Sequence, residues 1–247
     1  MPPKEDCPIC FLRLPYRESG STYMPCCGKE LCTGCIYAFQ SRITKDEHNL
    51  GPFCRAPTPK SEEEITKRLK KRVELNDAQA MYNVACHYCN GRFGLPRDHA
   101  KALELWHRAA ELGDADAYCN VANAYKDGRG VERDEKKALH YAELAAIEGE
   151  SKARYNLGVS ELHAFNFDRA LRHFMIAARD GYSNSLEGIK IMYLGGDATK
   201  DDHTKALRSY QSYLNEIKSD QRDEAVAFDD KSPTKNTMNL PSNLIIR

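Results

Sequence analysis

Long hydrophobic runs are missing from this chain, and so is an excess of charge of one sign. No apolar segment approaches the roughly 18 residues that a membrane-spanning helix requires. The 247 residues carry 36 Lys and Arg against 36 Asp and Glu, so the basic face that nucleic-acid binding needs is not expected. The first ten residues hold acidic side chains and two cysteines, where a secretory signal would be apolar. These absences predict an intracellular protein, in the cytoplasm or the nucleus, with neither a membrane nor nucleic acid as its partner.

Cysteine is abundant and unevenly distributed. Seven of the ten cysteines lie between residues 7 and 54. In a reducing compartment, such a cluster indicates metal ligands more than disulfides. The hydrophobic content of 41% is ordinary for a globular protein, and the length fits one or two domains.

Four of these cysteines form two Cys-x-x-Cys pairs, at residues 7–10 and 32–35. Zinc binds four ligands in a tetrahedron, and a Cys-x-x-Cys turn places two thiolates on one metal without strain. The segment that contains them has few large apolar residues, so it needs a metal to fold. The sequence therefore predicts a zinc finger over residues 1–60, with one site formed by Cys7, Cys10, Cys32 and Cys35.

The order of the stretches CPIC, PCCGKELCTGC and GPFCR resembles a RING finger of the all-cysteine subclass. The resemblance implies two zinc ions in a cross-brace, the first on the four cysteines above and the second on Cys26, Cys27 and Cys54. The last ligand pair of that family is usually Cys-Pro-x-Cys, and Gly51 stands in place of its first cysteine. His48 is the candidate for the missing ligand. There are two alternatives to His48. A bound water could be the fourth ligand, or the second site could be weakly loaded or lost.

RING fingers hold a ubiquitin-conjugating enzyme charged with ubiquitin in an apolar groove between the two zinc loops. By position, the resemblance implies that the groove is formed by Ile9, Phe39, Pro52 and Phe53. The residue after the last ligand is often a cation that braces ubiquitin, and it is Arg55 in this chain. The alternatives are that the apolar side chains form the small core of the finger and that Arg55 is a solvated surface charge.

A stiff linker with prolines at positions 57 and 59 follows the finger. Ser61 and Glu64 then have the spacing of a capping box. Ile65, Leu69 and Val73 follow at intervals of four, which is the spacing of a narrow apolar stripe on a helix. We therefore expect an amphipathic connecting helix over residues 61–75.

Internal repetition occupies residues 76–218. A pattern with Asp98, Lys101, Ala102 and Gly113 recurs 36 residues later with Asp134, Lys137, Ala138 and Gly149. Each unit is predicted to form two helices, at about 114–126 and 134–148 in the second unit. The pattern resembles the Sel-1-like variant of the tetratricopeptide repeat. The resemblance implies four repeats stacked into an α-solenoid that serves as an adaptor scaffold.

The expected fold is thus mainly α, with a small N-terminal zinc-bound RING-like finger followed by an α-solenoid of helix–turn–helix repeats. The concave face of the solenoid, formed mostly by first helices, is the expected groove for a protein substrate or partner. Its candidate residues are Asn83, His87, Asn120, Asn123, Asn156 and Glu161. The polar residues 219–247 are predicted to form a disordered tail.

Two functions follow from these features. The first is a RING-type ubiquitin ligase, in which the finger recruits the conjugating enzyme and the repeats hold the substrate. Such a ligase has no covalent nucleophile of its own. The second is a non-catalytic adaptor with a degenerate finger. The glycine at position 51 favours the adaptor, whereas the matching groove residues favour the ligase.

Overall fold

The computed structural model describes residues 6–15, 20–42 and 50–231, with side chains up to residue 228. This part of the chain holds two short strands and eleven helices, so the expected mainly α fold is confirmed. The chain divides into two compact units. Among the described residues, the repeat unit comprises 84–215. The cysteine-rich unit comprises the segments up to residue 83 together with 216–231. None of the described helices is long and apolar enough to cross a membrane.

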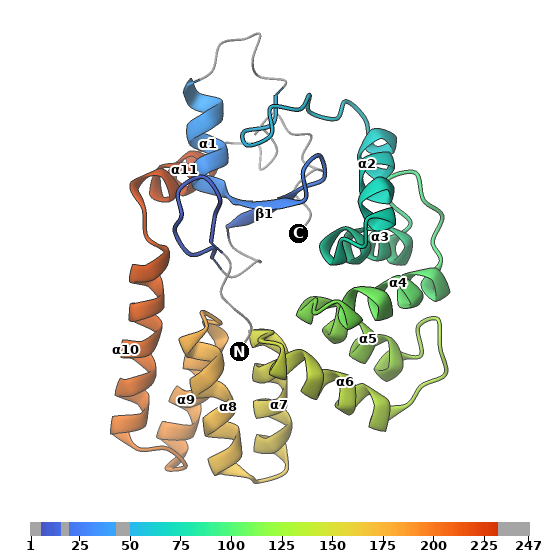
Figure 1. The fold of residues 1–247 in the computed structure, drawn as a ribbon. Coiled ribbons are helices and arrows are strands. Elements are labelled where there is room, and N and C mark those ends of the chain that lie inside the picture. Colours follow the sequence, from blue (N-terminus) through green and yellow to red (C-terminus); the bar gives the residue numbers. More distant parts are fainter. Residues whose placement is uncertain (1–5, 16–19, 43–49, 232–247) are drawn as a thin grey trace. The chain divides into compact units, whose positions relative to one another are not determined.

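The cysteine-rich unit contains a small hairpin (Figure 1). Strand β1 (Ser21–Met24) pairs antiparallel with β2 (Lys29–Cys32), with Thr22 opposite Leu31. The turn between them contains Gly28, whose φ of 70° is in the left-handed region that glycine adopts readily. Helix α1 (Thr33–Arg42) follows β2 directly. The core of this unit consists largely of sulfur, because its buried members are Cys7, Met24, Leu31, Cys32, Cys35 and Ile36.

Helix α2 (Glu62–Glu74) is the predicted connecting helix. Its N-terminus has the expected capping residues, because the Ser61 side chain accepts a hydrogen bond from the Glu64 amide at 3.2 Å. The Glu64 carboxylate accepts in turn from the Lys60 amide, one residue before the cap. Ile65 and Leu69 are fully buried, as the apolar stripe predicts.

Helix α11 (Asp220–Lys231) corrects the prediction of a disordered tail for those residues. It packs against α1 within the cysteine-rich unit, where the rings of Tyr37 and Phe228 lie 5.4 Å apart. Arg222 and Ala225 are buried there, although most of this helix is polar. A low average hydrophobicity therefore concealed two positions that pack against the finger. The rest of the predicted tail lies outside the described residues.

The repeat region holds eight consecutive helices, four pairs in chain order, and α7 and α8 run side by side in Figure 1. Helices predicted at 114–126 and 134–148 are observed within a residue of those limits. The helices are α3 (Ala78–Asn90), α4 (His99–Glu111), α5 (Ala115–Asp127), α6 (Glu135–Ile147), α7 (Ser151–His163), α8 (Phe167–Arg179), α9 (Asn184–Gly195) and α10 (Lys200–Ile217).

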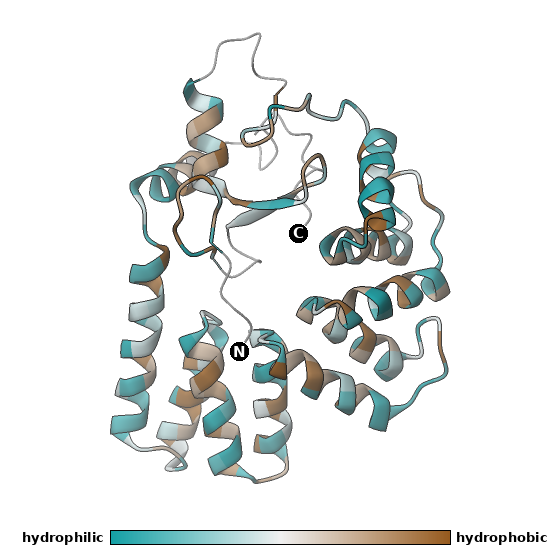
Figure 2. Cartoon of the chain, in the orientation of Figure 1, coloured by the Kyte–Doolittle hydropathy of each residue, from teal (hydrophilic) through white to brown (hydrophobic). Residues whose placement is uncertain are grey.

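Two regular features build these pairs. Figure 2 shows apolar and polar positions alternating along the repeat helices, and the buried apolar positions are mostly alanines that permit close helix contact. Acidic side chains cap the N-termini of α4 to α7 by accepting from the amide three residues later, as between Asp114 and Ala117 at 2.8 Å, and Asp77 does the same for α3. The four capping residues are Asp98, Asp114, Asp134 and Glu150.

One glycine is required where two repeats meet. Gly130 has a φ of 76°, and a Cβ atom at this position would lie 2.5 Å from the backbone oxygen of His99 at the start of α4. Any side chain would therefore push α4 away from the turn that precedes α6. This contact explains why the sequence repeats glycine in this turn.

Two of the residues expected in the partner groove are buried. Asn83 and His87 are 1% and 4% exposed, and the His87 ring stacks on Phe93 with centroids 4.1 Å apart. They therefore cannot contact a partner in this conformation, which corrects the prediction. Asn123 and Asn156 are exposed and stay as candidates.

Candidate metal centre

The first predicted zinc site is assembled by the structure. One sulfur atom from each of Cys7, Cys10, Cys32 and Cys35 lies within 4.8 Å of the other three. The Cys10 and Cys32 sulfur atoms are 3.8 Å apart. A zinc ion with four sulfur ligands at about 2.3 Å requires sulfur atoms about 3.8 Å from one another. The donor set and its spacing therefore fit zinc.

Two backbone turns position these sulfur atoms. The Cys7 amide donates to the Leu12 oxygen at 2.9 Å, and the Phe11 amide donates back to the Cys7 oxygen at 2.8 Å. Phe11 takes a φ of 57° to close this turn. On the other side, β2 ends and α1 begins between the two remaining ligands, and the Cys35 amide donates to the Cys32 sulfur at 3.4 Å. A hydrogen bond of this kind stabilises a thiolate.

The electrostatics of the metal-free cluster oppose full ionisation. Burial raises the pKa of the Cys35 thiol to about 12. The hydrogen bond with Cys32 lowers the pKa of Cys7 to about 4, and it raises the pKa of Cys32. The metal-free site thus retains protons at neutral pH, and zinc must displace them when it binds.

Arg222 of α11 is a member of this centre that the sequence analysis missed. Its side chain is 6% exposed, and Nη2 lies 3.9 Å from the Cys10 sulfur. Nη1 donates to the Ile217 oxygen at 2.5 Å. Burial opposes its charge, but the sulfurs of Cys32 and Cys10 raise its pKa. Four thiolates on one zinc ion carry a net charge of about −2, which a buried guanidinium offsets.

The fit of α11 against α1 depends on one small residue. A Cβ atom on Gly34 would lie 2.7 Å from the Arg222 backbone nitrogen. Glycine therefore allows the start of α11 to approach the helix that carries Cys35. Only a pattern joining residues nearly 190 positions apart could have revealed this contact from the sequence.

The second predicted site has three described ligands. The sulfur atoms of Cys26, Cys27 and Cys54 lie within 4.8 Å of one another. The Cys26 sulfur is 4.0 Å from that of Cys27 and 3.1 Å from that of Cys54. His48, the expected fourth ligand, lies outside the described residues. The three thiols fit a soft or borderline metal ion.

The residues expected to bind a conjugating enzyme are partly brought together. The Arg55 guanidinium lies over the Phe39 ring, 4.7 Å from its centroid, an arrangement typical of cation–π attraction. Phe53 is 43% exposed and Ile9 is 37% exposed. Pro52 is half-buried in the same turn as Phe53. Arg55 is exposed and has the Phe39 ring as a specific neighbour.

The hairpin is also held against the end of α2. The Tyr23 hydroxyl donates to the Asp77 carboxylate at 2.8 Å, and Arg72 donates to the same oxygen at 2.7 Å. Burial and the neighbouring Asp77 carboxylate raise the pKa of Tyr23. A Cβ atom on Gly28 would overlap the Arg72 guanidinium, so the turn that carries Cys26 and Cys27 lies directly on this network.

Comparison with known proteins identifies the repeats. The Sel1 repeat family model matches residues 78–114 and 115–150, so the chain contains Sel1 repeats. A crystal structure of a Sel1 repeat protein from Oxalobacter formigenes is 27% identical, with a TM-score of 0.53, over 63% of this chain and 65% of that one. This neighbour supports the solenoid fold of the repeat region. The family match does not include the cysteine-rich residues 7–54.

Two curated relatives share part of the sequence. The ERAD-associated E3 ubiquitin-protein ligase component HRD3B of Arabidopsis thaliana is 34% identical over 45% of this chain and 18% of its own length. Chitin synthase regulatory factor 4 of Schizosaccharomyces pombe is 27% identical over 54% of this chain and 21% of its own length. The matched part of this chain thus spans about a fifth of the length of each relative.

Proposed function

We propose that this protein is an adaptor whose Sel1 repeats bind a protein partner and whose cysteine-rich unit is a metal-stabilised interaction module. The single observation that carries the proposal is the match of two consecutive repeats to the Sel1 family. Repeats of this type build extended surfaces from successive helices, and such surfaces suit the binding of proteins. The exposed Asn123 and Asn156 place amide groups on α5 and α7, the first helices of two successive repeats.

The relatives suggest the system in which the adaptor works. HRD3B is named as a component of an E3 ubiquitin-protein ligase. We extend this to the present chain as the proposal that its partner belongs to the ubiquitin-ligation machinery. A component of this kind brings substrate and ligase together and needs no catalytic residue.

The test is affinity purification of the full chain from cells, followed by quantitative mass spectrometry against known ligase subunits. The Asn123→Arg, Asn156→Arg double variant is expected to lose partner enrichment at least tenfold, because it places two charges on the first helices that are expected to line the partner groove. Lys136 on α6 is also exposed, and Lys136→Glu is the matched control that should retain enrichment. Equal enrichment of ligase subunits by all three proteins, or by none, would refute the proposal.

A second candidate function is ubiquitin ligation by the finger itself. The observation that favours it is the contact between Phe39, which the RING resemblance places in the groove, and Arg55, which it matches to the ubiquitin-bracing cation. In this hypothesis, Ile9 and Phe53 complete the surface for the conjugating enzyme. The exposure of both side chains is consistent with such a role.

Ubiquitin discharge from a panel of charged conjugating enzymes tests the ligase hypothesis. Ile9→Ala is expected to abolish discharge without loss of zinc, because burial of an isoleucine contributes about 1.5–3 kcal/mol to a weak contact. Arg55→Ala is expected to slow discharge but to leave binding of the conjugating enzyme intact. Phe11→Ala, in the same turn as Ile9 and 77% exposed, is the control. Absence of discharge by the wild-type protein with every enzyme would leave the adaptor function alone.

A further inference from the structure

The turns at residues 7–12 and 51–56 have the same backbone. In the first, residue 7 donates to the oxygen of residue 12 at 2.9 Å and accepts from the amide of residue 11 at 2.8 Å. In the second, residue 51 donates to the oxygen of residue 56 at 2.7 Å and accepts from the amide of residue 55 at 3.0 Å. The fifth residue of each turn has a positive φ, 57° and 56° respectively. Position 51 is therefore the structural equivalent of position 7.

A side chain at position 51 would point at the second cysteine cluster. A Cβ atom built on Gly51 lies 3.4 Å from the Cys54 sulfur and 3.7 Å from the Cys26 sulfur. Cys7 supplies a ligand from the equivalent position in the first cluster. The backbone thus holds a place for a fourth ligand that glycine does not fill.

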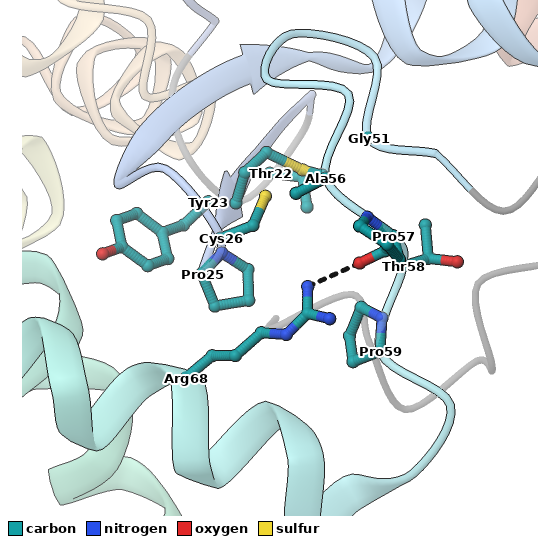
Figure 3. Close-up of a pocket in the computed structure, with 11 residues that line it drawn as sticks. Thr22, Tyr23, Pro25, Cys26, Gly51, Ala56, Pro57, Thr58, Pro59 and Arg68 are labelled. Carbon is teal, nitrogen blue, oxygen red and sulfur yellow. Dashed lines mark hydrogen bonds between the residues drawn. The ribbon is translucent and has the colours of Figure 1, made fainter.

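A small pocket opens onto this place. Its walls include Cys26 and Gly51 on the metal side and Arg68 of α2 on the other (Figure 3). The remaining walls are mainly apolar, from residues 22–25 of the hairpin and residues 56–59 of the linker. The cavity of about 20 Å³ has room for one water-sized group. The pocket therefore places a space of about the size of one ligand atom beside Cys26 of the second cluster.

We propose that Cys26, Cys27 and Cys54 form an open three-thiolate metal site that takes its fourth ligand, a thiolate, from another molecule. This goes beyond the adaptor function and does not depend on it. Zinc and cadmium prefer four ligands in sites of this type and bind sulfur strongly. The entering sulfur would occupy the place of the side chain that Gly51 lacks.

The chemistry of the pocket favours a thiolate over water. A metal-bound water donates two hydrogen bonds, whereas a thiolate donates none, and the carbonyls of Ala56 and Pro57 would each have to accept a second hydrogen bond beside those from the Gly51 amide and from Arg68 at 2.7 and 2.6 Å. The Arg68 guanidinium favours an anionic ligand, and the prolines at 25, 57 and 59 suit the carbon stem of a thiol. Arg68 also pairs with Glu64 at 2.5 Å, which holds it in position.

Cadmium NMR of the full chain tests the proposal, because each site gives its own resonance and the shift reports the number of sulfur ligands. The protein is loaded with cadmium under a phosphine reductant, so that no added thiol competes. Glutathione and a short peptide with a single cysteine are then titrated in separate arms, as a free thiol and a protein side chain. The resonance of the second site should move and saturate at one thiol per chain, whereas that of the first site should stay.

Variants at position 51 sharpen the result. The Cβ contacts of 3.4 Å and longer show that a side chain fits there. Gly51→Cys should give the shifted resonance without added thiol and should no longer respond to thiol. Gly51→Ala, which fills the same space without a ligand, should respond at least tenfold more weakly than wild type. Stronger binding in one arm assigns the source of the thiolate.

Three outcomes would overturn the proposal. One is a second-site resonance in wild type that no thiol moves. Another is a resonance that moves with thiol only in His48→Ala, which would make His48 the fourth ligand. The third is the binding of a single cadmium ion per chain in the presence of either thiol.

Discussion

The two compact units of this protein are stabilised by different kinds of core. In the cysteine-rich unit, three of the six buried core residues are cysteines, and the hairpin has only eight strand residues. In the repeat unit, the buried positions are alanines with a few large side chains, such as Phe174 and Met192. The first core closes around four cysteines that could hold a metal ion, whereas the second closes around helix–helix contacts.

This difference teaches which unit depends on conditions outside the chain. A core of thiols gains little from burial unless a metal replaces their protons, since buried thiols resist ionisation. A solenoid core gains from each neighbouring helix in turn, so its stability is spread over many small contacts. Four changes should affect one unit more than the other, and their expected effects decrease in the order that follows.

Loss of the first zinc ligand set should have the largest effect. Cys10→Ser should unfold the cysteine-rich unit, because a structural zinc ion contributes about 10–16 kcal/mol of apparent folding free energy in small domains. The repeats should keep their helical circular dichroism. Cys119→Ser, in a half-buried position of α5, is the matched control. An unchanged zinc content in Cys10→Ser, measured by native mass spectrometry, would refute the assignment.

A cavity in the repeat core should destabilise the repeat unit and leave the cysteine-rich unit intact. Phe174 is 1% exposed and lies against Tyr155, with ring centroids 5.4 Å apart. Phe174→Ala should lower the free energy of unfolding of the repeats by about 3–5 kcal/mol and leave the zinc content unchanged. Phe165→Ala, at a position 78% exposed, should change little. Denaturant titration followed by circular dichroism measures both, and equal losses would contradict the packing.

Acid should weaken the repeat unit at His87. Burial lowers the pKa of His87 to about 4, and within the described residues neither ring nitrogen has a hydrogen-bond partner. The unfolded chain, with a pKa near 6.5, therefore binds the proton more readily. Stability is complete above pH 6.5, falls by up to about 3 kcal/mol as the pH drops from 6.5 to 4, and levels off below.

Denaturant midpoints measured at pH 7 and pH 5 report this loss. His87→Gln should reduce the difference between the two midpoints, because glutamine does not titrate. The exposed His140 offers a control, and His140→Gln should keep the full difference. An identical pH dependence in wild type and His87→Gln would show that other groups cause it.

Removal of the buried cation should have the smallest effect of the four. Arg222→Ala should speed zinc loss from the first site about 10–100-fold, as is typical when a partner of the metal ligands is removed. Arg222→Lys should restore part of the retention through charge alone. Asp223→Ala, at an exposed position next to it, should release zinc at the wild-type rate. Release is followed with a colorimetric chelator, and equal rates in all four proteins would contradict the role of Arg222.

The parts that could be predicted from the sequence are those with local patterns. The repeat helices follow from spacings of alanine, glycine and capping aspartates, and the first metal cluster follows from two Cys-x-x-Cys pairs. The contact of Arg222 with Cys10 could not be predicted from the sequence. It joins distant segments, and α11 has too few apolar residues to indicate a buried helix. Asn83 and His87 were misplaced because polarity alone was read as exposure. The ligand position beside Gly51 could be recognised only by comparing the backbones of the turns at residues 7–12 and 51–56.

The position of Arg222 has a consequence for the order of events during synthesis. A chain made from its N-terminus completes the four cysteines of the first cluster long before residue 222 leaves the ribosome, and domains generally fold as they emerge. The nascent cluster can therefore take up zinc while its charge is still uncompensated. All the repeat helices are made before α11 arrives, so the last described helix would secure an ion that the first segment had already taken up.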